Sequence, residues 1–110
     1  MNILFICSRN QWRSPTGELV WRKASGVSVR SAGTSPKARR TVNAKDIAWA
    51  DIIFVMEQKH KDRLRATFPA PLKYAKLHVL DIPDEYQYGD PELIDLIKSG
   101  TEHIVGKARS

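Results

Sequence analysis

A continuously apolar run near the start of the chain, Ile3-Leu4-Phe5-Ile6, is the feature that most constrains its fold. A second run of the same kind, Ile52-Ile53-Phe54-Val55, follows further along. Strands that lack alternation between apolar and polar residues are typical of a parallel sheet that helices cover on both faces. The first run is too short to span a membrane and has no basic segment before it, so it predicts neither a membrane helix nor a signal peptide.

Short apolar runs alternate with longer amphipathic stretches, which indicates βα units around a parallel sheet. The expected strands are 2–6, 27–29, 51–56 and 77–80. Helices are expected to begin where a capping side chain precedes a proline, at Ser14-Pro15, Ser35-Pro36 and Asp90-Pro91. The inward stripe of the first helix is predicted at Leu19, Val20 and Ala24. Segment 69–76, which contains two prolines, is expected to be a loop.

Length, charge and cysteine content narrow the functional classes. A chain of 110 residues predicts one domain, residues 1–110. Its single cysteine excludes an internal disulfide and a cysteine-rich zinc site, and the cytoplasm is the expected location. The 18 Lys and Arg residues against 12 Asp and Glu give a net charge of +6, which favours anionic partners. Nucleic acid is not favoured, because the aromatic residues do not cluster with the cations, and no membrane partner is expected.

The stretch that carries chemistry is Cys7-Ser8-Arg9-Asn10-Gln11-Trp12-Arg13-Ser14-Pro15, between the first expected strand and the first expected helix. Ligands bind at this edge of an open α/β sheet, where a helix N-terminus offers free amides and a positive dipole to an anion. The same field stabilises a thiolate, so Cys7 is a candidate nucleophile. Arg13 can bind two oxygens of a tetrahedral oxyanion, and the Ser14 hydroxyl can donate to the sulfur as well as cap the helix.

A lone cysteine is more often a small buried apolar residue, and it is the combination with Arg13 and Ser14 that favours catalysis. Nucleotide-driven chemistry is not expected, because the sequence has neither a G-K-[ST] nor a G-x-G-x-x-G motif.

Four blocks of the sequence resemble the low-molecular-weight protein tyrosine phosphatases, and they occur in that family's order over most of the chain. They are Cys7 to Pro15, Arg30-Ser31-Ala32-Gly33-Thr34, Ala50-Asp51-Ile52-Ile53-Phe54-Val55-Met56-Glu57 and Ile82-Pro83-Asp84-Glu85-Tyr86. The resemblance implies an α/β fold, a doubly wound, four-stranded parallel sheet with helices on both faces. It also implies hydrolysis of phosphate monoesters through a phosphocysteine intermediate, on phosphotyrosine in protein or on a small aryl phosphate.

The resemblance also implies roles for individual residues. Cys7 would attack phosphorus, while Arg13 and the loop amides would hold the phosphoryl oxygens. Asp84 would protonate the leaving oxygen and then activate water. The residues expected to bind phosphate or support the loop are Ser8, Arg9, Asn10, Gln11, Trp12 and Ser14, with Asn10 stiffening the loop and Ser14 assisting the sulfur. No cofactor or metal is implied, and phosphate or vanadate is expected to inhibit.

Other acidic residues and the histidines are given different roles. Asp90 is interpreted as the cap of the last helix, and Asp81 as the end of a strand. Because His60, His78 and His103 lack the spacing of metal ligands, they are interpreted as surface or packing residues.

The chain departs from the family pattern near the expected site. After Thr34 it has Ser35-Pro36-Lys37-Ala38-Arg39-Arg40 instead of an aromatic wall, which leaves the preference for phosphotyrosine open. Arg9 stands where a glycine is common. Trp12 stands where many members have a cysteine, and it either adds an aromatic surface to the pocket or packs on the first helix. The cations Lys37, Arg39 and Arg40 either form a solvated face or attract an acidic phosphorylated substrate.

Two alternatives to a phosphatase remain open at this point. One keeps the fold but changes the reaction, as in a cysteine phosphocarrier or an arsenate reductase. The other is a non-catalytic or weakly active phosphate-binding regulatory module, which the shortened segment after Thr34 supports.

Overall fold

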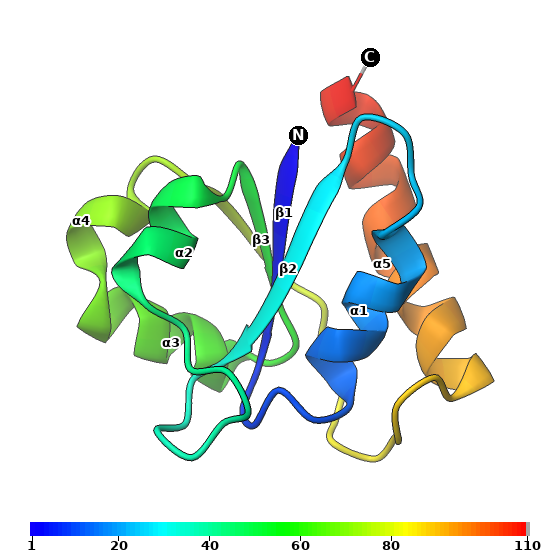
Figure 1. Cartoon of the computed structure of the whole chain (residues 1–110), viewed down its shortest axis with the longest axis horizontal. Coiled ribbons are helices and arrows are strands. Elements are labelled where there is room, and N and C mark those ends of the chain that lie inside the picture. The colour runs from blue at the N-terminus through cyan, green and yellow to red at the C-terminus, as the bar shows by residue number, and fades with distance from the viewer. Residues whose placement is uncertain (110) are drawn as a thin grey trace.

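The computed structural model describes residues 1–109 of the chain. Four parallel strands form one sheet in the order β2-β1-β3-β4: β1 (Asn2–Cys7), β2 (Ser28–Gly33), β3 (Ile52–Val55) and β4 (Lys76–Val79). The helices are α1 (Arg13–Trp21), α2 (Ala44–Trp49), α3 (Gln58–Thr67), α4 (Pro69–Leu72) and α5 (Pro91–Arg109). Figure 1 shows α1 and α5 on one face of the sheet and α2, α3 and α4 on the other. The predicted fold class, a doubly wound parallel sheet of four strands, is confirmed.

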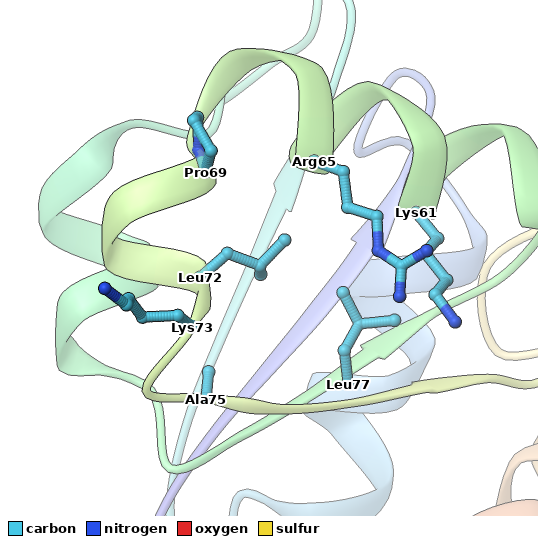
Figure 2. Close-up of a pocket in the computed structure, with 7 residues that line it drawn as sticks. All are labelled: Lys61, Arg65, Pro69, Leu72, Lys73, Ala75 and Leu77. Atoms are coloured by element: carbon cyan, nitrogen blue, oxygen red, sulfur yellow. The ribbon is translucent and has the colours of Figure 1, made fainter.

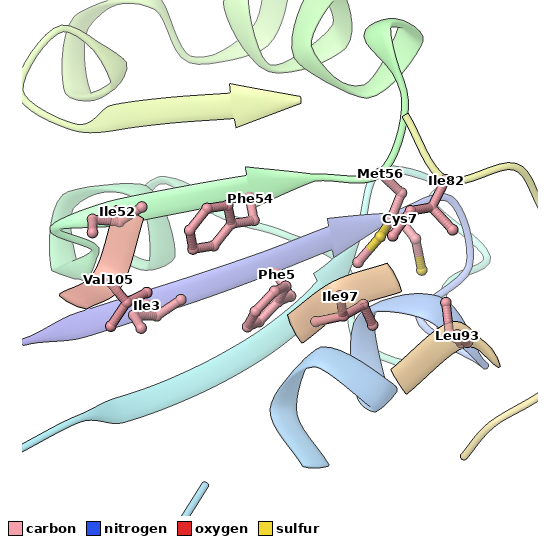
Figure 3. Packing of buried hydrophobic residues seen from close by; sticks show 10 residues of the cluster. All are labelled: Ile3, Phe5, Cys7, Ile52, Phe54, Met56, Ile82, Leu93, Ile97 and Val105. Atoms are coloured by element: carbon pink, nitrogen blue, oxygen red, sulfur yellow. The ribbon is translucent and has the colours of Figure 1, made fainter. Parts of the chain in front are cut away.

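The two central strands divide their side chains between two hydrophobic layers. Ile3, Phe5, Ile52 and Phe54 point toward α1 and α5, and Figure 3 shows them beside Leu93, Ile97 and Val105 of α5. The intervening residues of β1 and β3 pack with α2, α3 and α4 on the opposite face; this second layer includes Leu4, Ile6, Ile53, Val55, Ile47, Leu64 and Leu72. Every residue of β3 is buried, as its continuous apolar run predicts.

The strand order places a topological switch at β1. The chain leaves β1 to form β2 on one side and later returns to form β3 on the other side. In doubly wound sheets, ligands bind at the carboxyl ends of the strands where the order reverses. Cys7 is the last residue of β1 and Glu57 follows the end of β3, so both lie at this edge of the sheet.

Two of the three predicted helix starts are wrong. Helix α1 begins at Arg13, and Ser14 lies inside it without capping it. No helix follows Ser35-Pro36, where the Ser35 hydroxyl accepts a hydrogen bond from the Lys37 amide and stabilises a turn. Helix α2 begins instead after Asn43, which exchanges hydrogen bonds with Asp46. The third start is confirmed: α5 begins at Pro91, and Asp90 accepts from the Glu92 amide.

The extents of several other elements also differ from prediction. Strand β2 runs over Ser28–Gly33 rather than 27–29, and one helical turn, α4, lies in the segment that is predicted to be a loop.

The buried face of α1 also differs from the predicted stripe. The fully buried residues of this face are Arg13, Ser14, Thr16 and Gly17. Of the predicted stripe, Val20 is partly buried and packs against the core, Leu19 is only partly buried, and Ala24 lies beyond the helix. Gly17 permits close packing, because a Cβ atom there would lie 2.5 Å from the ring of Phe5.

None of the helices within residues 1–109 combines the length and apolar character that crossing a bilayer requires. Over the same residues, no cluster of three or more His, Cys, Asp or Glu side chains is placed to hold a metal ion.

Candidate active site

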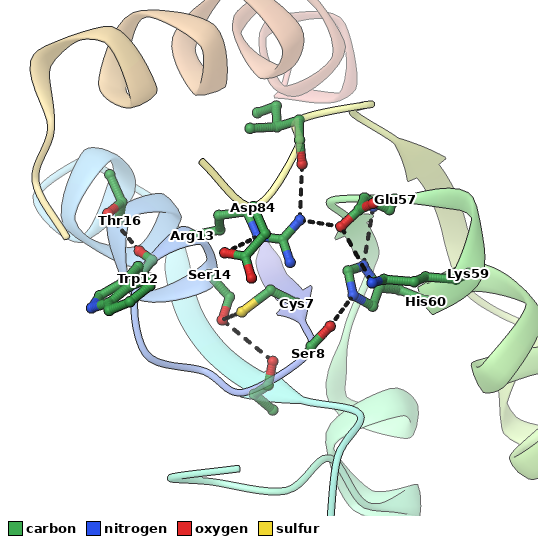
Figure 4. A network of polar contacts seen from close by, with 12 residues as sticks. Cys7, Ser8, Trp12, Arg13, Ser14, Thr16, Glu57, Lys59, His60 and Asp84 are labelled. Atoms are coloured by element: carbon green, nitrogen blue, oxygen red, sulfur yellow. Dashed lines mark hydrogen bonds and ion pairs between the residues drawn. The ribbon is translucent and has the colours of Figure 1, made fainter. Parts of the chain in front are cut away.

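The Cys7 thiol lies buried at the end of β1, beneath the N-terminus of α1 (Figure 4). Its sulfur is 2.9 Å from the Ser14 hydroxyl oxygen, which in turn accepts a hydrogen bond from the Asn10 side-chain amide, also at 2.9 Å. Because Asn10 occupies an acceptor position of this hydroxyl, the Ser14 proton is free to point at the sulfur or, at the longer distance of 3.4 Å, at the Ala32 carbonyl. Ser14 can therefore stabilise a thiolate at Cys7.

Asn10 fixes the shape of the segment between β1 and α1, which we call the Cys7 loop (residues 7–13). Its φ of 55° lies in the left-handed region, which asparagine tolerates better than most residues. Besides Ser14, its amide donates to the Ser31 hydroxyl of β2 at 2.9 Å. One buried side chain thus ties the loop both to the start of α1 and to the neighbouring strand.

The backbone of the Cys7 loop is turned so that its carbonyls face outward. The carbonyls of Cys7, Ser8 and Arg9 accept hydrogen bonds of 3.0 to 3.1 Å from the amides of the outer loop (residues 34–41); the donors are Thr34, Ser35 and Arg39. Within residues 1–109, none of the amides of residues 8–13 donates a backbone hydrogen bond. These amides are therefore available to a ligand, as at other helix N-termini that bind anions.

Arg13 is only 2% exposed, and its buried guanidinium is held by several partners. Its Nη1 donates to Glu57 Oε1 at 2.5 Å and to the Ile82 carbonyl at 2.9 Å, while its Nε lies 3.6 Å from Asp84 Oδ1. Burial acts to raise the pKa of Glu57, but the hydrogen bond and the charge of Arg13 outweigh it and leave the pKa below its ordinary value. Glu57 is thus ionised at neutral pH and fixes the guanidinium.

His60 and Ser8 form a second polar contact at the Cys7 loop. The Glu57 amide donates to His60 Nδ1 at 3.0 Å, and His60 Nε2 lies 2.9 Å from the Ser8 hydroxyl oxygen. Burial, reinforced by the charge of Arg13, lowers the pKa of His60 to about 4, so the ring is neutral near pH 7. Since Nδ1 is an acceptor, the single ring proton is on Nε2 and is donated to Ser8. The Ser8 hydroxyl proton is then free to bind a ligand.

Asp84 faces the same small pocket as Cys7 and Arg13. The pocket measures about 30 Å³, and its lining consists of Cys7, Ser8, Arg9, Gln11, Trp12, Arg13 and Asp84. Asp84 is 57% exposed and stands at the open side, whereas Cys7 is buried. Asp90 is not part of this lining, because its carboxylate caps α5, and Asp81 is an exposed residue with a φ of 56° just beyond β4.

All nine predicted site residues gather at this edge of the sheet. Seven of them line the pocket, while Asn10 and Ser14 lie beneath it in contact with each other. The sequence interpretation missed Glu57 and His60 as parts of the site. Glu57 had a usable signal, because it directly follows the buried run of β3, next to β1, at the edge where Cys7 emerges. His60 offered only its place three residues later, in the first turn of α3.

The basic residues of the outer loop divide into different environments. Arg40 donates to the Ser31 carbonyl at 2.9 Å and pairs with the buried carboxylate of Asp46, so it holds the fold together. Arg39 lines a groove beside the Cys7 loop, and Lys37 is exposed.

Another hollow, of about 430 Å³, lies between α3, α4 and β4 (Figure 2). The described residues that line it are aliphatic or cationic and include Lys61, Arg65, Leu72 and Leu77. None of these lining residues is a cysteine, serine, histidine or carboxylate, so this hollow lacks the kind of thiol and acid pair that faces the pocket at Cys7.

Solved structures of known proteins share this fold over the whole chain, while no family model and no curated protein sequence matches it. A low molecular weight phosphotyrosine phosphatase from Vibrio cholerae is 23% identical, with a TM-score of 0.78 over 100% of this chain and 97% of that chain. Wzb from Vibrio vulnificus, in complex with benzylphosphonate, is 24% identical, with a TM-score of 0.78 and coverages of 96% and 97%. The YwlE arginine phosphatase from Geobacillus stearothermophilus is 23% identical, with a TM-score of 0.72 and coverages of 96% and 94%. The fold is that of the low-molecular-weight phosphotyrosine phosphatases, as the four sequence blocks predict.

Proposed function

We propose that the chain is a cysteine-dependent phosphatase that hydrolyses phosphate monoesters, with phosphotyrosine in protein or a small aryl phosphate as substrate. The observation that carries the proposal is the Cys7 loop, whose carbonyls are bonded outward to residues 34–39 while its amides remain available around a buried thiol. This arrangement suits a phosphoryl group, which has several anionic oxygens and an electrophilic centre.

The first step transfers the phosphoryl group to sulfur. The Cys7 thiolate attacks phosphorus, the S–P bond forms, and the bond from phosphorus to the leaving oxygen breaks. Arg13 and the loop amides neutralise the charge on the equatorial oxygens. Asp84, at the open side of the pocket, gives its proton to the leaving oxygen, so the alcohol departs neutral.

The second step returns the enzyme to its starting state. The Asp84 carboxylate takes a proton from water, the water oxygen attacks phosphorus, and the S–P bond breaks to release inorganic phosphate. Ser14 supports the departing sulfur, because its hydroxyl lies 2.9 Å from Sγ and donates as the thiolate forms again. Metal chemistry is not required by these steps.

The alternatives predict different behaviour. A phosphocarrier does not need an acid beside Cys7 and Arg13, yet Asp84 lines the same pocket. Relay of oxidation through further cysteines, as in a thiol-dependent arsenate reductase, is not possible within a chain that contains one cysteine. A non-catalytic module would bind phosphate without turnover.

Hydrolysis of p-nitrophenyl phosphate tests the proposal. We expect turnover that phosphate and vanadate inhibit competitively, that disappears in Cys7→Ser, and that falls by roughly 10²- to 10³-fold in Arg13→Ala, the usual cost of removing a transition-state charge partner. Tyr74→Ala, at an exposed position outside the pocket, serves as the matched control. Full activity in Cys7→Ser would exclude the covalent mechanism, and phosphate binding without turnover would indicate the regulatory module.

A further inference from the structure

A buried imidazole, that of His60, lies directly behind the hydroxyl of Ser8. Ser8 follows Cys7 in the sequence and lines the small pocket with it, and it also lines a larger groove together with Lys59 and Arg63. His60 Nε2 is 2.9 Å from the Ser8 hydroxyl oxygen, and a dashed line joins the two groups in Figure 4. A serine and a histidine in this relation can serve in two ways, with the serine as a nucleophile or as a hydrogen-bond donor to a ligand.

The tautomer of His60 excludes the first role. The Glu57 backbone amide donates to His60 Nδ1 at 3.0 Å, and a backbone amide can only donate, so Nδ1 carries no proton. The ring is neutral near pH 7, because burial, followed by the charge of Arg13, lowers the pKa of His60 to about 4. Its one proton is therefore on Nε2. A nitrogen that already carries a proton cannot take one from Ser8, so His60 does not activate Ser8 as a base.

The same tautomer determines where the Ser8 hydroxyl points its own hydrogen. The hydroxyl oxygen accepts from His60 Nε2, which leaves the hydroxyl hydrogen for another group. Within residues 1–109, His60 is the only side chain that forms a hydrogen bond with this hydroxyl, so no second side chain competes for that hydrogen. The acceptor that suits the pocket is an anionic oxygen, because the free amides of the Cys7 loop surround the same space.

His60 can hold this direction because the imidazole is itself fixed. It is 1% exposed and lies in the first turn of α3. Both of its ring nitrogens are occupied, one by the Glu57 amide and the other by the Ser8 hydroxyl. A rotation of the ring would break at least one of these bonds inside the protein, where a lost hydrogen bond is costly.

Glu57 connects this arrangement to Arg13. Its carboxylate accepts from Arg13 Nη1 at 2.5 Å, while its backbone amide donates to His60. One residue after β3 thus orients a charged donor through its side chain and a neutral donor through its backbone. The two donors come from opposite ends of the Cys7 loop, since Ser8 follows Cys7 and Arg13 begins α1.

We propose that the Ser8 hydroxyl is a further donor to the phosphoryl group and that His60 is the positioning residue that directs it there. The hydroxyl donates to a phosphoryl oxygen beside the bonds from Arg13 and the loop amides. Because that oxygen is present in the ester and in free phosphate alike, the bond contributes to the binding of both, and to KM more than to kcat. The inference rests on the proposed phosphatase function for its substrate, but the binding of inorganic phosphate tests it without turnover.

Inorganic phosphate is the probe, and its affinity is measured by calorimetry in the Cys7→Ser background. Addition of Ser8→Ala should raise the Kd about tenfold, the usual contribution of a hydrogen bond to a charged group, and Ser8→Thr should restore most of the affinity. His60→Leu should raise the Kd about fivefold, whereas His60→Gln, whose amide can still donate to Ser8, should raise it by less than about twofold. Ser28→Ala, at an exposed position on the opposite edge of the sheet, is the matched control.

A double-mutant cycle separates positioning from a merely structural role of His60. In the Ser8→Ala background, His60→Leu should change the Kd of phosphate by less than about 1.5-fold, because His60 acts through the Ser8 hydroxyl. An equal effect of His60→Leu with and without that hydroxyl would refute the positioning role. In the Cys7-containing enzyme, Ser8→Ala should raise KM for p-nitrophenyl phosphate about tenfold and change kcat by less than about threefold.

The tautomer has a spectroscopic test that needs no altered protein to fold. Long-range ¹⁵N–¹H correlation spectra of the wild type at pH 7 should show one protonated ring nitrogen in His60, Nε2, and added phosphate should shift its resonance. A proton on Nδ1 or a cationic ring would overturn the inference.

The outcomes distinguish this inference from the proposed function. If the wild type hydrolyses no ester while Ser8→Ala still weakens phosphate binding, the phosphatase proposal fails and the Ser8 donor stands. Turnover by the wild type, with an unchanged Kd of phosphate in Ser8→Ala, would retain the phosphatase and refute the Ser8 donor.

Discussion

Mild acid should destabilise the chain through one buried imidazole, that of His60. This side chain is 1% exposed, and its Nδ1 accepts the hydrogen bond from the Glu57 amide. Protonation of Nδ1 would place two donors against each other inside the protein. Burial, followed by the charge of Arg13, lowers the pKa of His60 from 6.5 to about 4 in the folded chain.

The size of the effect follows from the two pKa values. Between pH 6.5 and 4 the unfolded chain binds a proton at His60 that the folded chain does not bind, so the free energy of unfolding decreases as the pH falls through this window. The difference between 6.5 and about 4 corresponds to roughly 3 kcal/mol over the whole window, of which about 2 kcal/mol is lost between pH 7.5 and pH 5. Burial, followed by the charges of His103 and Lys76, also lowers the pKa of His78, which adds to the effect with the same sign.

Urea denaturation of the wild type and of His60→Gln at pH 7.5, 6.5, 5.5 and 5 isolates the contribution of His60. Glutamine does not titrate, and its amide can still donate to the Ser8 hydroxyl. Between pH 7.5 and pH 5 the wild type should lose about 2 kcal/mol more stability than the variant, whatever the variant's stability at pH 7.5. Parallel stability curves for the two proteins would refute the assignment of a neutral, buried imidazole at this position.

Two further pairs of variants test the acid and the packing of α1. Asp84→Asn should lower kcat for ester hydrolysis by roughly 10²- to 10⁴-fold and remove the basic limb of the pH profile. Asp90→Asn should leave turnover intact and cost little stability, because asparagine also caps a helix. Turnover that is lost in Asp90→Asn and kept in Asp84→Asn would reverse the assignment of the acid. Gly17→Ala should destabilise the chain by about 1 to 3 kcal/mol in urea denaturation, since its Cβ would lie 2.5 Å from the Phe5 ring. At Gly106 on α5, a Cβ would meet nothing within 4 Å, so Gly106→Ala should stabilise the chain by about 0.5 to 1 kcal/mol. An equal loss of stability in both variants would contradict the prediction that the Phe5 contact makes Gly17 special.

The parts of the fold that the sequence predicts are those that one local signal determines. The buried strands β1 and β3 are continuous apolar runs, and Asp90-Pro91 is a cap followed by a proline with no competing partner. Ser14 and Ser35 carry the same local signal as Asp90. In the structure, however, the Ser14 hydroxyl contacts the Cys7 sulfur, so a contact within the site overrides the capping preference there. The Ser35 hydroxyl instead accepts from the Lys37 amide and stabilises a local turn, which is the other conformation that a serine at such a position favours.

In the candidate site, too, the residues that a local signal determines could be predicted, and those that depend on contacts between distant segments could not. Cys7 and Arg13 are recognisable because a strand, a loop and a helix fix their relation within a few residues of sequence. Glu57 and Arg13 are 44 residues apart, and their contact depends on β3 pairing with β1. The role of Trp12 could not be decided from the sequence either, because both of its predicted environments suit a tryptophan at the start of α1.

Hydrogen exchange in the outer loop can report on the motion of the Cys7 loop, because the two loops are joined by hydrogen bonds. Amides in an irregular segment usually exchange rapidly with solvent deuterium, but those of Thr34, Ser35 and Arg39 are bonded to the carbonyls of the Cys7 loop. The exchange rates of these three amides therefore measure how often the Cys7 loop separates from the outer loop, although none of the three belongs to the Cys7 loop. Gly33 belongs to the same coupling, because a Cβ there would lie 2.5 Å from the Ser8 carbonyl oxygen and push the two loops apart. A change in the length of the outer loop would therefore alter the Cys7 loop through its carbonyls, without replacing any residue that lines the pocket at Cys7.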